Sequence, residues 1–157
     1  MSKQSSRVFV IGFGNPGRQD DGLGPALAEA IEKLNLTDVT VDSDYQLVVE
    51  VAAEVAVHDV VVFVDATVSG AEPFSFEKLV PEPGISFSSH SVKPQALLAL
   101  AQELFQSRAE GYLLAIRGYA FDTLEERLTD QARTNLNAAI SFLTRRLTER
   151  NFDSVVA

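Results

Sequence analysis

The sequence contains no cysteine among its 157 residues. This absence excludes a disulfide framework, a thiol nucleophile and a thiolate metal site, and it fits a reducing compartment. Long apolar runs are missing as well. The first apolar run, Val8–Ile11, is far too short for the core of a signal peptide or for a membrane span. We therefore expect a cytoplasmic protein that does not enter a membrane.

Basic residues are few, because 13 lysines and arginines stand against 22 aspartates and glutamates, for a formal net charge of −9. This balance repels a phosphate backbone, which argues against general nucleic-acid binding and leaves a cation or a basic peptide segment as partner. The length suits one domain over residues 1–157, with a core of about 7–149 and a monomeric state.

Short apolar runs alternate along the chain with segments of helical spacing. Strands are expected at Val8–Ile11, Val39–Val41, Val60–Val64, Phe74–Leu79 and Tyr112–Ile116, and helices from about Pro25, over Gln46–Ala56, from Pro94 and after a cap at Thr129. The order β α β α β β α β α predicts an α/β fold with a mainly parallel sheet and helices on both faces. Sites in such sheets lie at the carboxyl ends of the strands.

The loop after the first strand, Gly12-Phe13-Gly14-Asn15-Pro16-Gly17, satisfies the pattern G-x-G-x-x-G, and Asp42 stands near the position of a ribose-binding acid. A dinucleotide site needs these glycines to run straight into a helix. Here the helix is delayed to about Pro25, and the acidic pair Asp20-Asp21 would repel phosphate. The pattern therefore argues weakly for a dinucleotide, and the glycines are expected to serve tight backbone geometry, with Asn15 bracing the loop.

Three side chains with ligand chemistry follow predicted strands or precede a helix: Asp21, Asp65 and His90. If the first and third strands are parallel neighbours, Asp21 and Asp65 emerge at the same edge of the sheet. Two carboxylates and one imidazole suit nickel, zinc or manganese, and three protein ligands leave open positions, as in reactive metal sites.

Each residue also has a structural interpretation when taken alone. Asp65 can cap a turn, Asp20 and Asp21 can form a solvated acidic turn, and His90 can be a turn residue in a serine-rich loop. His58 ends a predicted helix, where an imidazole meets the helix dipole, and we assign it a structural role. Ser89 and Ser91 lie in no nucleophile elbow.

Two families carry a similar first loop. The turn Gly-x-x-Asn-Pro-Gly occurs in peptidyl-tRNA hydrolases, but the resemblance stops at Gly17, and their catalytic histidine is missing there. The whole stretch Gly12–Gly24 resembles the hydrogenase maturation endopeptidases instead. Further segments resemble the same family, in the same order along the chain: Asp44-Tyr45-Gln46-Leu47 with Glu50, Val62-Phe63-Val64-Asp65-Ala66, and Ser89-His90-Ser91.

This resemblance implies a three-layer α/β/α sandwich with a mainly parallel, mixed central sheet (phosphorylase/hydrolase-like). It implies a peptidase that removes the C-terminal extension of a nickel–iron hydrogenase large-subunit precursor. Asp21, Asp65 and His90 would be both the catalytic residues and the metal ligands, and Asp20 a turn or supporting residue. Nickel would come with the substrate, although a surrogate divalent metal can bind.

The chemical step stays open between two classes, an aspartyl peptidase and a metallopeptidase. A nickel-sensing or chaperone-like module without proteolytic activity is the rival hypothesis, and a dinucleotide-binding protein is the third.

Overall fold

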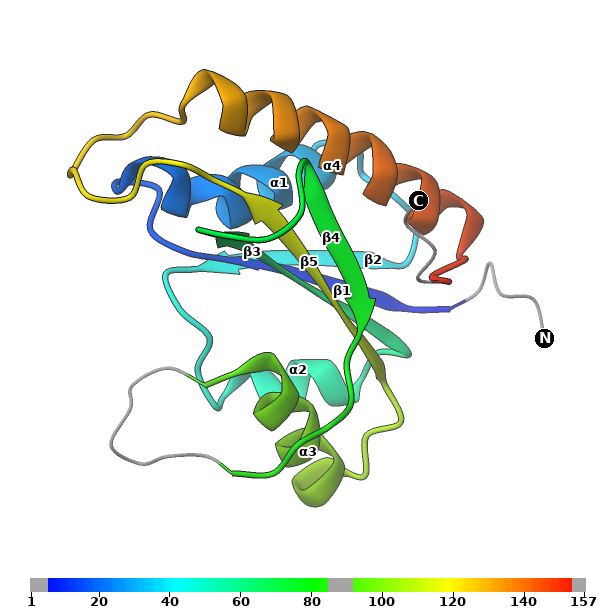
Figure 1. Cartoon of the computed structure of the whole chain (residues 1–157). Helices are drawn as coiled ribbons and strands as arrows, with labels where there is room; N and C mark the ends of the chain where they lie inside the picture. Colours follow the sequence, from blue (N-terminus) through cyan, green and yellow to red (C-terminus); the bar gives the residue numbers. More distant parts are fainter. Residues whose placement is uncertain (1–5, 85–91, 154–157) are drawn as a thin grey trace.

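A computed structural model describes residues 6–84 and 92–153 of the chain (Figure 1). Its elements follow the predicted order, with a short 3₁₀ helix, η2, added before the first α-helix. In chain order they are β1 (Val8–Phe13), η2 (Gln19–Gly22), α1 (Leu23–Glu32), β2 (Val39–Asp44), α2 (Val51–Ala56), β3 (Val60–Thr67), β4 (Phe74–Lys78), α3 (Pro94–Phe105), β5 (Glu110–Arg117) and α4 (Asp130–Glu149).

The five strands form one sheet in the order β2-β1-β3-β5-β4. Four of them are parallel, and β4 pairs with β5 in the antiparallel direction. Val10 of β1 lies between Val41 of β2 and Val62 of β3 in this register. The mainly parallel, mixed sheet implied by the sequence is therefore confirmed.

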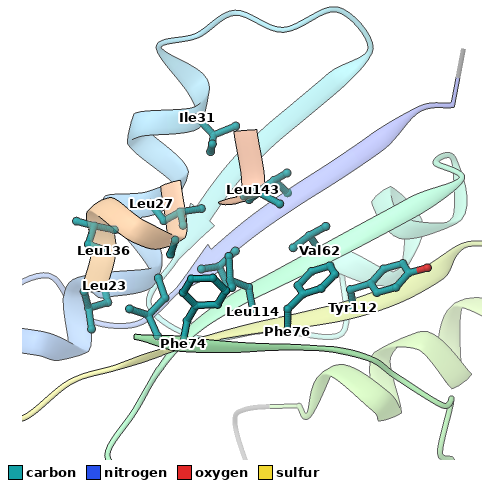
Figure 2. Packing of buried hydrophobic residues seen from close by; sticks show 14 of the residues in the cluster. Leu23, Leu27, Ile31, Val62, Phe74, Phe76, Tyr112, Leu114, Leu136 and Leu143 are labelled. Atoms are coloured by element: carbon teal, nitrogen blue, oxygen red, sulfur yellow. The ribbon is translucent and has the colours of Figure 1, made fainter. Parts of the chain in front are cut away.

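Helices cover both faces of the sheet, which gives three layers (Figure 1). On one face, α1 and α4 pack onto Val62, Val64 and Leu114, and Figure 2 shows leucines of both helices over these strands. On the other face, α2 and α3 pack onto Val61 and Phe63. A strand covered on both faces needs apolar residues at every position, which explains the continuous apolar run of β3.

Two helix starts follow the predicted cues. Pro25 is the third residue of α1, so this helix does begin several residues after the glycine pattern ends. The Thr129 side chain caps α4 by accepting the backbone N–H of Ala132 at 3.2 Å. Within the ranges that the structure describes, no helix has the length and apolar character needed to cross a membrane.

The predicted helix over Gln46–Ala56 is too long, because α2 begins only at Val51. Leu47 is buried at 1% exposure, yet its carbonyl accepts the N–H of Val92 at 3.2 Å instead of starting a helix. The apolar spacing from Leu47 to Val51 therefore reflects burial in one core and not helical structure.

Two strands extend beyond their predicted ends. β1 continues through Gly12 to Phe13, and β3 continues past Asp65 to Thr67, because β5 is long enough to pair with Asp65, Ala66 and Thr67. Asp65 thus lies within β3, and the prediction that it closes this strand is wrong. Its side chain points to the α2/α3 face, since successive residues alternate between faces.

His58 has the structural role predicted for it. Its Nδ1 lies 2.7 Å from the carbonyl oxygen of Glu54 at the end of α2, and its Nε2 lies 3.0 Å from the Thr40 hydroxyl. The ring also stacks on Phe9 at a centroid distance of 5.3 Å. His58 therefore joins α2 to β1 and β2, away from the carboxyl edge of the sheet.

Candidate functional site

The end of β1 and the loop that follows it require glycine where two backbones approach closely. Gly14 has a φ of +140°, and a Cβ there would lie 2.1 Å from the carbonyl oxygen of Asp21. A Cβ on Gly12 would lie 2.1 Å from the carbonyl oxygen of Gly24, which places the first turn of α1 directly against β1. Both glycines therefore serve tight backbone geometry, as predicted.

Asn15 braces this loop from inside. Its side-chain oxygen accepts the N–H of Gly17 at 2.9 Å, which closes a turn, and its own N–H donates to Oδ2 of Asp21 at 2.7 Å. The bracing role predicted for Asn15 is confirmed, and it bears on the ligand candidate directly, because the second bond fixes one carboxylate oxygen of Asp21.

The neighbouring residue, Asp20, is fully buried and not a solvated turn residue. Its carboxylate accepts the N–H groups of Tyr119, Ala120 and Thr129 and the hydroxyl of Thr129, at 2.8 to 3.1 Å. Burial alone would raise its pKa, but these hydrogen bonds outweigh burial and leave the pKa of Asp20 below its ordinary value. Asp20 is therefore held as a carboxylate and is saturated with donors.

Asp21 and Asp65 meet in one cavity at the carboxyl edge of the sheet. The cavity has a volume of about 370 Å³. Its walls come from the end of β1, from η2 and β3, from the segment after β2, from the start of α3 and from the middle of β5. The lining residues are Phe13, Gly14, Asp21, Tyr45, Gln46, Leu47, Asp65, Val92, Lys93, Pro94 and Leu113. The predicted convergence of the two aspartates is confirmed, and its cause is the parallel pairing of β1 with β3.

Each of these two carboxylates has one oxygen committed to a backbone N–H. Asp21 uses Oδ2 for Asn15, and Asp65 uses Oδ1 for Ala66 at 2.8 Å. The other oxygen of each accepts no hydrogen bond from residues 6–84 and 92–153. As far as the described residues go, both aspartates therefore keep an oxygen for water, a proton or a cation, whereas Asp20 does not.

The electrostatics of the cavity disfavour two negative charges. Burial raises the pKa of Asp65, the Ala66 N–H opposes this, and the nearby Asp21 raises it further, to about 7. A positive ion between the carboxylates would relieve both the burial cost and the repulsion. The donor chemistry of the cavity therefore fits a divalent cation with oxygen ligands.

His90, the third predicted ligand, lies outside the described residues, and its place in the site stays a prediction. Val92 and Lys93, which follow it by two and three positions, line the cavity. Among the residues that the structure does describe, no group of three or more histidine, cysteine and acidic side chains could hold a metal ion.

Sequence reasoning missed four residues that line the cavity, Phe13, Val92, Lys93 and Leu113. Phe13 could have been predicted as a cavity residue if the first strand had been extended to its true end. Lys93 lies directly before Pro94 and is the N-cap of α3. The predicted start of this helix could therefore have identified Lys93 as a residue near the site. A second cavity of about 510 Å³ runs along α1 and β2 and contains neither Asp21 nor Asp65.

No protein-family model and no curated protein sequence matches this chain. Solved structures do. The NiFe hydrogenase maturation protease HycI from Thermococcus kodakarensis matches with a TM-score of 0.70 and 23% identity, over 90% of this chain and 92% of its own.

Two further structures match at similar coverage. The hydrogenase maturating endopeptidase HybD from E. coli has a TM-score of 0.66 and 18% identity, over 92% of this chain and 94% of its own. The hydrogenase 2 maturation peptidase from a Thaumarchaeota archaeon has a TM-score of 0.66 and 20% identity, over 91% and 99%. The chain therefore has the fold of hydrogenase maturation proteases, as the resemblance in its sequence implied.

Proposed function

From this shared fold and the paired carboxylates, we propose that the protein is an endopeptidase of hydrogenase maturation. It removes the C-terminal extension of a nickel–iron hydrogenase large-subunit precursor after nickel has been inserted. The observation that carries the proposal is the meeting of Asp21 and Asp65 in one cavity, in a chain with the fold of such proteases.

Substrate recognition follows from the charge of the cavity. Asp21 and Asp65 each keep an oxygen that accepts no hydrogen bond from the described residues, and the raised pKa of Asp65 reflects the cost of a buried charge with the charge of Asp21 beside it. A nickel ion carried by the substrate lowers this cost, so a nickel-loaded precursor binds better than an empty one. His90 supplies the third ligand in this proposal, and nickel belongs to the substrate and not to the resting enzyme.

Peptide hydrolysis requires water to attack the scissile carbonyl carbon, the C–N bond to break and a proton to reach the leaving nitrogen. A metal would polarise the carbonyl or acidify the bound water. The chain itself supplies two carboxyl groups, of which one takes the proton from water and the other delivers a proton. Where no cation occupies the cavity, a pKa of about 7 lets Asp65 exchange a proton near neutral pH.

The proposal is tested by incubating the purified protein with nickel-loaded precursor and measuring the mass of the large subunit. We expect a single loss of mass at the C-terminus. Asp21→Asn, Asp65→Asn and His90→Gln should fold but leave the precursor uncut, because each variant removes one ligand.

The matched control is Asp42→Asn, which makes the same chemical change on an exposed residue of β2 that does not line the cavity. It should process the precursor at the wild-type rate. Full processing by both Asp21→Asn and His90→Gln would refute the assignment. An uncut large subunit with altered nickel content would instead support a nickel-sensing module.

A further inference from the structure

We infer that Asp20 is a positioning residue, which holds the free carboxylate oxygen of Asp21 in the cavity by anchoring η2 to the segment between β5 and α4. The inference rests on the proposed function for its kinetic consequence but not for its structural one. Asp20 itself does not line the cavity.

The anchor consists of four hydrogen bonds that span the chain. The donors are the N–H groups of Tyr119, Ala120 and Thr129 and the Thr129 hydroxyl, all about 100 residues away from Asp20 in the sequence. Thr129 also caps α4. One carboxylate therefore joins η2 to the end of β5 and to the first turn of α4.

Backbone hydrogen bonds join η2 to the same segment between β5 and α4. The N–H of Asp20 donates to the carbonyl of Ala120 at 2.9 Å, and the N–H of Gln19 donates to the carbonyl of Glu125 at 2.8 Å. Gly118 makes room for the anchor, because a Cβ there would lie 2.8 Å from the Cβ of Asp20 and 2.8 Å from Cζ of Phe121. The close approach of Asp20 to the segment between β5 and α4 thus depends on Gly118, which carries no charge.

Asp21 depends on this anchor because η2 has little support of its own. The helix is four residues long and has no side-chain cap at Arg18. The N–H of Asp21 donates to the carbonyl of Arg18 within the same turn, so a shift of Asp20 moves the backbone of Asp21 with it. The bond from Asn15 N–H to Asp21 Oδ2 then reports where the carboxylate lies.

A purely structural role and a positioning role make different predictions. Loss of a merely structural bond lowers stability and reduces the folded fraction, but the folded molecules keep their kcat and their Asn15 environment. Loss of positioning changes the folded molecules themselves. Displacement of a reacting group by about 1 Å can cost about 100-fold in rate.

The experiment compares Asp20→Asn and Gly118→Ala with the wild type, using the full chain and nickel-loaded precursor. The amide of asparagine cannot accept from three converging N–H groups as a carboxylate does. We expect kcat to fall at least tenfold while KM changes less than twofold. In nuclear magnetic resonance spectra, the Asn15 amide signal should shift in both variants.

Asp122→Asn is the control, since it removes an exposed carboxylate from the same segment; it should leave kcat and the Asn15 signal unchanged. Should Asp20→Asn fail to fold, Thr129→Val removes one of the four bonds, and Thr129→Ser, which keeps the hydroxyl, is its matched control. Wild-type kcat with an unshifted Asn15 signal in a folded Asp20→Asn or Thr129→Val variant overturns the inference.

If the wild type cuts no precursor, the proposed function fails, and the Asn15 signal together with binding of Ni²⁺ alone decides the inference. A shifted signal and nickel binding weakened about tenfold in Gly118→Ala then support positioning by Asp20. An unshifted signal and unchanged nickel binding refute it.

Discussion

Replacing Asp65 by asparagine should stabilise the metal-free protein, and the gain should grow with pH. The side chain lies half-buried in the cavity, and burial together with Asp21 raises its pKa to about 7. Asparagine keeps the size of the side chain and the acceptor for the Ala66 N–H. It removes only the charge that the cavity disfavours.

The sign and the range of the effect follow from the two pKa values. Below about pH 4, Asp65 is protonated in both folded and unfolded chains, so its ionisation does not affect stability. As the pH rises toward 7, the unfolded chain loses this proton and the folded chain keeps it, so the wild type loses stability. Above about pH 7 both forms are ionised and the loss levels off.

The magnitude is set by the difference between the ordinary pKa of 3.8 and the folded value of about 7. A tenfold change in proton affinity corresponds to about 1.4 kcal/mol, so this difference corresponds to up to about 4 kcal/mol at pH 8. That is a large share of the stability of an ordinary domain, which is roughly 5–15 kcal/mol.

The assay is urea unfolding of the wild type and Asp65→Asn at several pH values between 4 and 9, with a chelator present to exclude metal. The free energy of unfolding of the variant, minus that of the wild type, should rise through this range. Asp21→Asn is the matched perturbation. It removes the neighbouring charge, lowers the pKa of Asp65 and should end the pH-dependent loss at a lower pH. A difference that stays constant from pH 4 to 9 would refute the reasoning.

Two further predictions concern the frame around the cavity. In Gly24→Ala, the new methyl group would lie 2.5 Å from the carbonyl oxygen of Phe13 and 2.6 Å from that of Val64, so the free energy of unfolding should fall by about 1–3 kcal/mol or more in urea titrations; an unchanged midpoint would contradict the close packing. In His58→Phe, the Glu54 carbonyl and the Thr40 hydroxyl each lose the hydrogen bond with the imidazole, which should cost about 1 kcal/mol per bond. Processing of the precursor should continue at the wild-type rate, and a lost activity at preserved stability would argue against a purely structural His58.

The sequence predicted the architecture well because the strongest signals came from burial. The runs at Val8, Val60 and Tyr112 are apolar at nearly every position, and only strands covered on both faces need such runs. Their parallel order then fixed the edge at which Asp21 and Asp65 meet. The convergence of these aspartates could therefore be predicted from topology without any knowledge of side-chain contacts.

The errors lie where a polar or small residue continues an element. Gly12 and Asp65 look like strand ends, but pairing with neighbouring strands carries β1 and β3 past them. At Leu47, burial was mistaken for helical periodicity, because the residue fills the α2/α3 core from an irregular segment. In both cases the structure depends on strands or core residues that are distant in the sequence, so a local pattern cannot indicate it.

The adjacent pair Asp20-Asp21 shows why residue type alone cannot identify a ligand. In a 3₁₀ helix, three residues complete a turn, so consecutive side chains point about 120° apart. One carboxylate thus turns inward and the other toward the cavity. Among the described residues, Asp20 meets four donors and is fully committed, whereas Asp21 meets one donor and has an oxygen to spare. The distinction depends on donors at residues 119–129, and it can be found only when the fold brings that segment to the loop.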